Sequence, residues 1–557
     1  MPRASWWNGS RPWCGQPGRW AWWPCWCWPP RCTGWRGGFR PRPRCARVAA
    51  RPEPLSRITP SPPFARSAAL THPATLPDTC PLYVDLDGTL TLSDTLHESA
   101  MLFVRRNPLN LLRMLAWLPS GKAGFKQRLA DAVRPDPAHL PYHEAFVDHL
   151  RAEHARGRPL VLASAADARI VREVADHLGV FDDTIGTNAQ GDGVNLSRAN
   201  KRAAIDAHAR AHGHTAWAYA GNSRDDLEVW AGSAQAIAVN APSGVVASLQ
   251  REQPSAQVFE RKPLSLKTVL RAIRLKQWSK NGLLFVPLLA AHSLDPALWG
   301  AVLIAFIAFG LCASATYLVN DLLDLPNDRA HRIKRHRPLA SGAIGIVPAV
   351  LLGAVMLALA FVLAFQVSTA FAVVLLAYTV TTLAYSLVLK RLALIDVLVL
   401  SGLYTLRIGA GAVASGVDLS NWLLAISIFL FLSLALIKRC AELEELEDED
   451  RTLAPGRGYQ ARDLASLRAM GMASGFLSVM VLALYIDSQN SQKLYAHPDA
   501  LWLAAPVLLL WIMRIWLKTG RRELHGEDPL QFALKDPFSW VTLLVMGGIG
   551  LVATVGL

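Results

Sequence analysis

The sequence predicts a chain of two unlike parts: an N-terminal α/β domain and a C-terminal all-α membrane bundle of about nine transmembrane helices. Almost every apolar run long enough to cross a membrane lies after Lys280, and the preceding residues are rich in arginine and proline. Short strand-like runs that end in polar residues recur in the first part. A soluble first half followed by a membrane-embedded second half fits both observations.

The composition of the whole chain argues against nucleic acid as a partner. The formal net charge is +14, but the sequence contains no zinc finger or other nucleic-acid-binding motif. Arginines that flank apolar helices are better explained by the positive-inside bias of membrane proteins. We therefore expect the partner of this basic chain to be the lipid bilayer and not a nucleic acid.

Residues 1–77 form a segment of biased composition, rich in Trp, Pro and Arg. Five of the eight cysteines and nine of the nineteen tryptophans fall within the first 50 residues. The cysteines lack paired CxxC units and nearby histidines, which argues against a zinc site. Prolines and arginines interrupt any apolar core of a signal peptide. We expect residues 1–77 to be a disordered extension without an assigned function.

Four polar segments follow in a fixed order between residues 80 and 250. The run Leu82–Val84 predicts a short buried strand that ends in Asp85, with Asp87 two residues later. A second strand, PLVLASAA, leads to Ser164. The remaining polar residues are Lys201, near the start of a predicted helix, and Gly221, Asn222, Asp225 and Asp226 in AWAYAGNSRDD.

This order resembles that of the haloacid dehalogenase-like phosphatases, with an expected domain at 78–255 and a helical cap at about 93–155. The resemblance implies that Asp85 is the nucleophile and Asp87 the general acid and base. Ser164 and Lys201 would hold the phosphoryl oxygens. The implied Mg²⁺ ligands, all oxygen donors, are Asp85, the carbonyl of Asp87, Asn222 and Asp226.

The chain departs from this family at one position. Gly221-Asn222 stands where the family usually has Gly-Asp, so one negative charge beside the expected metal is lost. An asparagine carbonyl still ligates Mg²⁺, and Asp225 or Asp226 offers a replacement charge. An active phosphatase and an inactive domain kept as a scaffold or regulator both remain open.

Nine apolar segments are candidates for membrane spans, and they lie at about 282–297, 299–319, 346–365, 369–389, 393–413, 420–437, 470–486, 501–517 and 538–557. If the first domain is cytoplasmic, the inner loops hold seventeen Lys and Arg residues and the outer loops only Lys493. This asymmetry supports nine spans and places the C-terminus outside. We expect a multi-pass protein of a bacterial inner membrane, with residues 256–281 as a linker and amphipathic segment leading into the bundle at 282–557.

A cluster of acids and bases follows the second predicted span, in the stretch YLVNDLLDLPNDRAHRIKRHRPLASG. Asn320, Asp324 and Asp328 recur every four residues, so in a continuous helix they share one stripe. Pro326 is expected to bend that helix. Carboxylates so close together repel unless a divalent cation lies among them, and a diphosphate commonly completes the coordination of Mg²⁺. Neighbouring bases such as Arg337 would bind the remaining phosphate oxygens.

The pattern Asn320-Asp321-x-x-Asp324-x-x-x-Asp328 resembles the first signature of the UbiA-type intramembrane prenyltransferases, over about residues 267–557. That resemblance implies Mg²⁺ held by these four residues and a polyprenyl substrate. The loop after the sixth span lacks the second Asp-x-x-x-Asp motif of the aromatic-ring branch. The segments RLKQWSKN, DRAHRIKRHRPLASG, YSLVLKR and LIKRCAEL instead resemble the decaprenyl-phosphate phosphoribosyltransferase branch.

On that resemblance, the phosphate oxygen of a polyprenyl monophosphate attacks the anomeric carbon of phosphoribosyl diphosphate and expels diphosphate, with Asp321, Asp324 and Asp328 as catalytic residues. Arg407, a lone charge inside the fifth predicted span, is a site candidate because a buried charge is expensive. The expected phosphate contacts are Lys280, Asn320, Lys334, Arg337, Lys390, Arg407, Lys438 and Arg439.

The fusion of the two parts suggests a tandem enzyme, in which the first domain removes the ribose 5-phosphate from the product of the second. The alternative is an aromatic-acid polyprenyltransferase that uses a prenyl diphosphate and carries an inactive or regulatory first domain. A transporter is disfavoured, because the predicted spans are nearly free of ionisable groups apart from Arg407.

Overall fold

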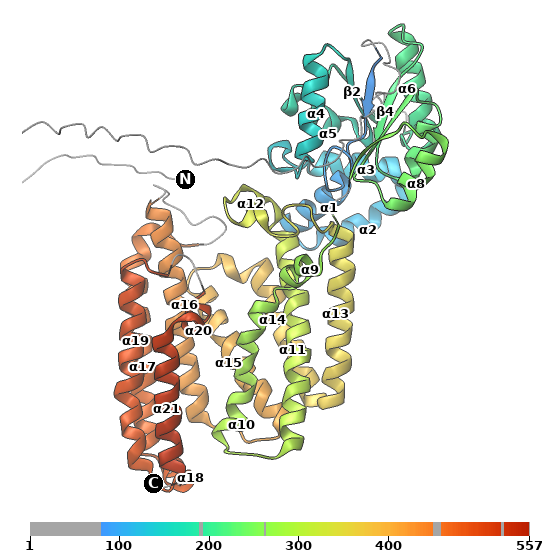
Figure 1. Cartoon of the computed structure of the whole chain (residues 1–557). Coiled ribbons are helices and arrows are strands. Elements are labelled where there is room, and N and C mark those ends of the chain that lie inside the picture. Colours follow the sequence, from blue (N-terminus) through green and yellow to red (C-terminus); the bar gives the residue numbers. More distant parts are fainter. Residues whose placement is uncertain (1–79, 189–192, 261–262, 449–457, 525–527, 556–557) are drawn as a thin grey trace, which may run out of the picture. The chain divides into compact units, whose positions relative to one another are not determined.

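The computed structural model describes residues 80–188, 193–260, 263–448, 458–524 and 528–555, with side chains of 445–448 left out. The expected extension at 1–77 lies outside these residues. All described residues belong to one compact unit, His72–Leu557. Within it, a parallel α/β domain precedes a bundle of long helices (Figure 1).

The α/β domain is built on a six-stranded sheet in the order β3-β2-β1-β4-β5-β6, in which every neighbouring pair is parallel. Its strands are β1 (Leu82–Val84), β2 (Leu160–Asp167), β3 (Asp183–Thr187), β4 (Ala218–Gly221), β5 (Gln235–Val239) and β6 (Gln257–Phe259). Because β1 lies between β2 and β4, the strand order reverses at the carboxyl end of β1. Ligands of open parallel sheets bind at such a reversal.

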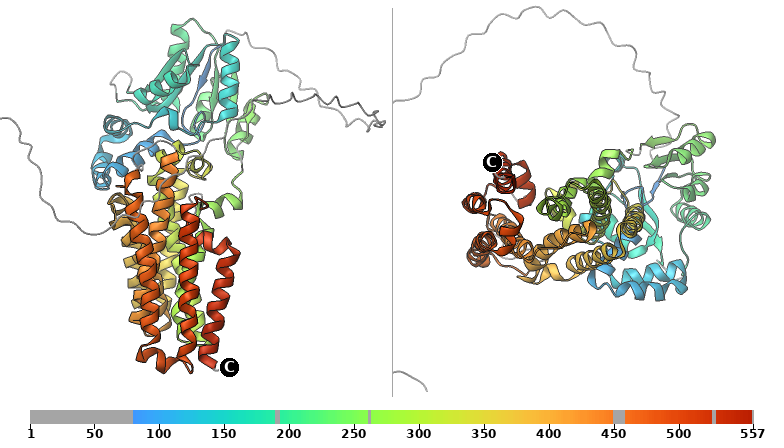
Figure 2. Two further views of the ribbon diagram at one scale, coloured as in Figure 1. Left: turned by 90° about the vertical axis from the view of Figure 1, so that its left-hand side faces the viewer. Right: turned by 90° about the horizontal axis from the view of Figure 1, so that it is seen from below.

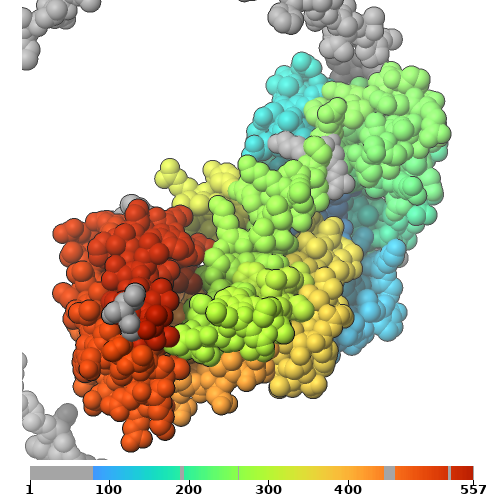
Figure 3. All heavy atoms as spheres, turned by 60° about the horizontal axis from the view of Figure 1, so that its bottom comes forward, coloured from blue at the N-terminus to red at the C-terminus, as the bar shows by residue number. Residues whose placement is uncertain are grey.

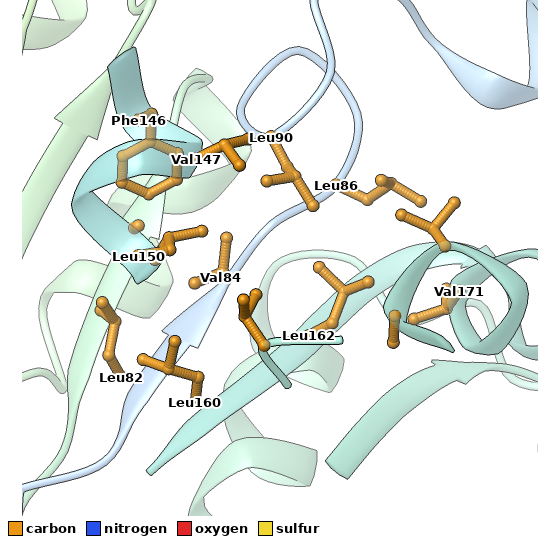
Figure 4. Close-up of a cluster of buried hydrophobic side chains, with 14 of the residues drawn as sticks. Leu82, Val84, Leu86, Leu90, Phe146, Val147, Leu150, Leu160, Leu162 and Val171 are labelled. Carbon is orange, nitrogen blue, oxygen red and sulfur yellow. The ribbon is translucent and has the colours of Figure 1, made fainter. Parts of the chain in front are cut away.

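Helices cover both faces of this sheet, and each face has its own apolar core. The helices after the cap are α4 (Glu144–Ala155), α5 (Ala168–Leu178), α6 (Ala199–Ala211), α7 (Leu227–Trp230) and α8 (Ser243–Glu252). On one face, Leu82 and Val84 pack with Phe146 of α4 and Val171 of α5 (Figure 4). Tyr83 points to the opposite core, as the alternation of side chains along a strand requires.

Four α-helices lie between β1 and β2, and the first three form the cap: α1 (Thr95–Arg106), α2 (Asn110–Trp117) and α3 (Gly121–Ala132). They have a separate small core around Phe103, Leu129 and Val133. Helix α4 falls inside the range expected for the cap, 93–155, but its apolar side chains pack in the core of the sheet. The cap helices therefore end at Ala132, earlier than expected.

The second half is helical throughout its described residues, and eight of these helices are long and apolar enough to cross a membrane. The long helices are α11 (Pro296–Leu323), α13 (Ile346–Val367), α14 (Thr369–Leu387), α15 (Ile395–Ser415), α16 (Asn421–Asp448), α17 (Leu464–Ile486), α19 (Ala504–Gly520) and α21 (Pro537–Val555). Short helices connect them: α9 (Leu266–Ala272), α10 (Val286–Ala290), α12 (Leu325–Ala330), α18 (Gln489–Leu494) and α20 (Pro529–Lys535). Helices α17–α21 gather on one side and α10–α13 on the other (Figure 3).

The expectation of nine spanning helices is wrong for the first segment, 282–297. Residues Leu275–Phe285 form a 3₁₀ helix, and between Phe285 and the start of α11 at Pro296 only Val286–Ala290 are α-helical. Pro287 lacks the backbone N–H that a continuous helix would need there. The chain nevertheless runs from α9 at one end of the bundle to α10 at the other (Figure 1). Irregular backbone at this depth requires burial within protein, and Lys280, Asn281 and Leu284 on this segment are buried.

The C-terminus lies at the end of the bundle opposite to α12 (Figures 1 and 2). This arrangement agrees with an odd number of passes through the bundle. The assignment of the α12 end to the cytoplasm remains a prediction from the charge bias of the loops.

Candidate functional site

The first candidate site lies at the carboxyl end of β1, where the strand order reverses. Asp85 directly follows the strand, and its backbone N–H donates to the carbonyl oxygen of Ala220 (2.9 Å). One carboxylate oxygen of Asp87 accepts a hydrogen bond from the backbone N–H of Thr95 (2.7 Å) in the first turn of α1. The partial positive charge of that helix end favours a carboxylate.

Gly88 allows the loop to turn back over this site. Its φ is +78°, and a Cβ there would lie 2.0 Å from Nδ2 of Asn222. No other residue fits both the conformation and the space. The turn thus brings Asn222, from the loop after β4, against the loop that carries Asp85 and Asp87.

Lys201 and Asp226 complete the first site as a buried ionic network. Nζ of Lys201 donates to Asp85 (2.9 Å) and lies 3.4 Å from Asp226. Burial alone would lower the pKa of Lys201, but attraction by the two carboxylates raises it above its ordinary value. Lys201 therefore carries a full charge where phosphoryl oxygens are expected.

Asp226 holds the loop that carries Asn222. One of its oxygens accepts from the hydroxyl of Tyr219 (2.6 Å). The other accepts from the backbone N–H of Asn222 (3.1 Å) and from the N–H and hydroxyl of Ser223 (2.9 and 2.8 Å). To serve as the metal ligand predicted from the sequence, Asp226 would have to release one of these bonds.

The two acidic residues of the loop titrate well above their ordinary range. Burial, with repulsion from Asp226, raises the pKa of Asp85 to about 6 despite the attraction of Lys201. Burial and repulsion from Asp94 and Asp85 raise the pKa of Asp87 to about 8. A cation between them would relieve this repulsion. The carboxylate of Asp85, the backbone carbonyl of Asp87 and the amide oxygen of Asn222 are donors that suit Mg²⁺.

A cavity of about 1330 Å³ brings the predicted residues of the first site together. Its lining includes all six of them, Asp85, Asp87, Ser164, Lys201, Asn222 and Asp226. It also includes Lys126 of the cap helix α3, which sequence reasoning missed because no motif surrounds it. Nζ of Lys126 donates to the carbonyl of Ala165 (2.6 Å) and to Asn195 (2.7 Å), and burial lowers its pKa.

The second candidate site is the Asp motif where α11 ends. Helix α11 stops at Leu323 and α12 begins at Leu325, with Pro326 in its first turn. The bend predicted from Pro326 is therefore present. It divides the stripe that a continuous helix would have given to Asn320, Asp324 and Asp328.

Each carboxylate of the motif contacts a basic side chain. Asp321 pairs with Arg274 (Nε–Oδ2, 3.1 Å). Asp324 pairs with Lys390 (2.9 Å), whose Nζ also lies 3.4 Å from Oδ1 of Asn320. The expected phosphate contact Lys390 is thus at the motif.

A single nitrogen atom, Nη1 of Arg337, joins two acids of the motif. It lies 2.6 Å from Asp328 and 3.4 Å from Asp321. The two carboxylates therefore converge on one point, which fits a shared divalent cation. Burial raises the pKa of Asp328, and repulsion from Asp321 and Asp324 adds to this effect.

A third polar cluster lies inside the bundle. Nζ of Lys280 contacts Asp528 (2.6 Å), and Nζ of Lys438 lies 3.6 Å from the same carboxylate. Arg407 is buried and donates to Asn281 (3.1 Å) and to the hydroxyl of Tyr378 (2.9 Å). Three cations against one carboxylate leave this cluster with excess positive charge.

Tyr317 links the inner cluster to the Asp motif, because it interacts electrostatically with Lys280 and Arg407 of the cluster and with Arg274 at the motif. The guanidinium of Arg407 lies over the rings of Phe309, Tyr378 and Tyr404. Arg274, which pairs with Asp321, lies over the ring of Tyr317, 5.2 Å from its centroid. Sequence reasoning missed Arg274 and Asp528, although an Asp-Pro pair before an apolar helix, as at 528–529, is a recognisable helix start.

Arg439 and Lys334 are also expected from the sequence to contact phosphate, but the structure places them in different surroundings. Arg439 is fully buried and pairs with Asp396 (2.5 Å) and Glu442, and it donates to the hydroxyl of Tyr385 (3.0 Å). This guanidinium holds α15 to α16. Lys334 lies on an exposed turn after α12.

A buried ion pair joins the cap to the Asp motif. Both carboxylate oxygens of Glu98, on α1, accept from the guanidinium of Arg329, which directly follows Asp328 (2.6 and 3.0 Å). The exposed side-chain fractions are 3% for Glu98 and 8% for Arg329. Glu98 has no local sequence signal, because its partner is 231 residues away.

We expect Glu98→Gln to leave a buried guanidinium without its counter-charge and to destabilise the chain by about 3–5 kcal/mol. Thermal unfolding of the detergent-solubilised full chain measures this loss. Glu173→Gln is the matched control, since its pair with Arg134 is 38% exposed on both sides and should contribute little. Equal effects of the two variants would contradict the importance of the buried pair.

We expect Mg²⁺ to bind the first site more weakly as the pH falls below about 6, because Asp85 then takes up a proton. Calorimetric titration of Mg²⁺ at pH 5 and pH 7 measures the change. Asp85→Asn identifies which part of the heat belongs to this site. An affinity that does not differ between the two pH values would exclude Asp85 as a ligand.

Comparison with known proteins gives the same division of the chain. Residues 82–230 match the haloacid dehalogenase-like hydrolases and residues 282–525 match the UbiA prenyltransferase family.

Uncharacterized protein y4nM of Sinorhizobium fredii is 37% identical over 83% of this chain and 88% of its own length. Two shorter relatives match about half of this chain. Nodulation protein NoeC of Azorhizobium caulinodans is 33% identical over 51% of this chain and 92% of its own length. The decaprenyl-phosphate phosphoribosyltransferase of Mycolicibacterium smegmatis is 32% identical over 51% and 91%. The chain therefore belongs to the UbiA prenyltransferase family, and a haloacid dehalogenase-like domain precedes its membrane bundle.

Proposed function

We propose that the bundle transfers a phosphoribosyl group from phosphoribosyl diphosphate to a polyprenyl monophosphate, with Mg²⁺ as cofactor. The observation that carries this proposal is the inner cluster of Lys280, Lys438 and Arg407 beside the Asp motif. A phosphate monoester carries up to two negative charges and matches such an excess of cations better than the single carboxylate of an aromatic acid does. The likeness to decaprenyl-phosphate phosphoribosyltransferases over half of the chain supports the same donor.

In the proposed reaction, the inner cluster binds the lipid phosphate, and the bases of the motif bind the diphosphate. Asn320, Asp321, Asp324 and Asp328 would hold Mg²⁺, which stabilises the charge on the leaving diphosphate. An oxygen of the lipid phosphate forms a bond to the anomeric carbon as the bond from that carbon to diphosphate breaks. The product is a lipid-linked ribose that keeps its 5-phosphate.

We further propose that the haloacid dehalogenase-like domain hydrolyses this 5-phosphate. The carboxylate of Asp85 attacks phosphorus, while protonated Asp87 donates its proton to the leaving ribose oxygen. A pKa of about 8 keeps Asp87 protonated at neutral pH, as this step needs. Ionised Asp87 then accepts a proton from the water that hydrolyses the aspartyl phosphate. Ser164 and Lys201 hold the phosphoryl oxygens throughout.

Asp321→Asn and Asp324→Asn should each lower the transfer of labelled phosphoribosyl diphosphate to polyprenyl phosphate by at least about 100-fold, since each removes a charge that holds Mg²⁺. The assay follows lipid-linked label in proteoliposomes. Lys493→Ala, at an exposed residue of the short helix α18, is the control and should leave transfer unchanged. Transfer of a prenyl group to an aromatic acid by the wild-type chain would contradict the phosphoribosyl proposal.

Asp85→Asn should leave the transferase active and cause the lipid product to keep its 5-phosphate, because the nucleophile is lost. Mass spectrometry of the lipid fraction distinguishes the two products. Asp148→Asn, at an exposed carboxylate on α4, is the matched control and should release phosphate as the wild type does. Undiminished phosphate release by Asp85→Asn would exclude Asp85 as the nucleophile.

A further inference from the structure

The cap helix α2 exposes an apolar face. Leu109, Leu111, Leu112, Leu115 and Leu118 are 52–67% exposed, although they lie in the soluble domain. Their spacing places four of them, from Leu111 on, along one side of the helix. A contiguous exposed patch of this kind marks an interaction surface.

The opposite side of α2 is already occupied. Trp117 stacks on Phe103 with a centroid distance of 5.2 Å, and Met114 packs in the same small core. The leucine face is therefore not the side by which α2 attaches to its own domain. It is a second apolar side, left for a different neighbour.

Basic residues predominate in the sequence around this face. The cap residues 101–130 contain six basic residues and no aspartate or glutamate. Four of the six, Arg106, Arg113, Lys122 and Arg128, are exposed. An amphipathic helix with an apolar face and basic flanks is typical of a segment that lies in the surface of an anionic bilayer.

The position of the face points to the same neighbour. Leu118, at its end, lines the cavity that contains Asp85. The lining of that cavity also includes Gly345, Ile346, Val347 and Pro348, at the start of the membrane-spanning helix α13. Helix α1 contacts both α11 and α13. The cavity is thus bordered both by the end of the leucine face and by the start of a membrane span.

We propose that Leu109 and the leucine face of α2 dock into the surface of the bilayer, and that the cavity beside them accepts a phosphate ester carried by a membrane lipid. The proposal that α2 docks into the bilayer rests on the exposed leucines, the basic residues beside them and the neighbouring membrane span. The substrate part rests on the proposed phosphatase function. A lipid-anchored ester reaches Asp85 by moving along the membrane surface, past Leu118 and Ile346.

Docking is tested by lipid contact, without use of activity. A fluorescent amino acid replaces Leu112 in the full chain, reconstituted in nanodiscs of phosphatidylcholine and phosphatidylglycerol, and a doxyl group on the lipid chains serves as quencher. Asp148, exposed on α4, is the matched control position. We expect quenching at 112 to exceed that at 148 by at least two-fold. Equal quenching, or shielding of the 112 probe from both lipid and aqueous iodide, would overturn docking, the latter in favour of a protein neighbour.

The substrate class is tested by replacing Leu111, Leu112 and Leu115 together with glutamine. We expect kcat/KM for lipid-linked ribose 5-phosphate in vesicles to fall at least ten-fold, and hydrolysis of soluble p-nitrophenyl phosphate to stay within two-fold. Val194→Gln, at an exposed apolar residue outside the cap, should change neither. No loss with the lipid ester, or an equal loss with both substrates, would contradict a membrane-borne substrate. If the wild-type chain hydrolyses neither ester, the proposed phosphatase function fails, and the quenching experiment still decides docking.

Discussion

Removal of a charge from water is expensive, and the candidate sites of this protein are organised by the need to compensate buried carboxylates. Asp85 contacts Lys201, Asp321 contacts Arg274, Asp396 contacts Arg439 and Asp528 contacts Lys280. In each pair the partners come from distant parts of the sequence, so each pair also ties separate elements together. A buried charge that loses its partner is strongly unfavourable. The same contacts that prepare the sites for phosphate and metal therefore hold the helices and loops in register.

The sequence predicted the parts of the sites that depend on local pattern. Asp85 and Asp87 follow a strand, and the carboxyl ends of parallel strands meet at one edge of the sheet, so Ser164 and Asn222 join them. The motif at 320–328 could likewise be recognised, because its acids emerge from an apolar run. All six residues predicted for the first site line one cavity. Their catalytic roles remain predictions.

Other parts could not be predicted, because their signals are tertiary. Asp528, Lys126 and Glu98 lie in segments without a motif, and Arg274, although it begins the segment RLKQWSKN, has no local signal for its pairing with Asp321. Only folding brings these residues to their partners. Arg439 illustrates the reverse case. It lies in a segment with a family resemblance and is predicted to contact phosphate, yet its guanidinium forms an ion pair with Asp396. The count of spans failed at 282–297 because a hydropathy pattern does not distinguish a regular helix from the buried 3₁₀ segment that carries Lys280.

Helix α1 connects the two candidate sites by rigid geometry. The backbone N–H of Thr95 holds Asp87, and three residues later the side chain of Glu98 holds Arg329, the neighbour of Asp328. These contacts lie about one helical turn apart, roughly 5 Å along the axis. A displacement of α1 that alters one contact must alter the other, because the helix between them does not stretch. If binding at one site displaces α1, the affinity of the other site changes as well, and by thermodynamic linkage the effect is equal in the reverse direction.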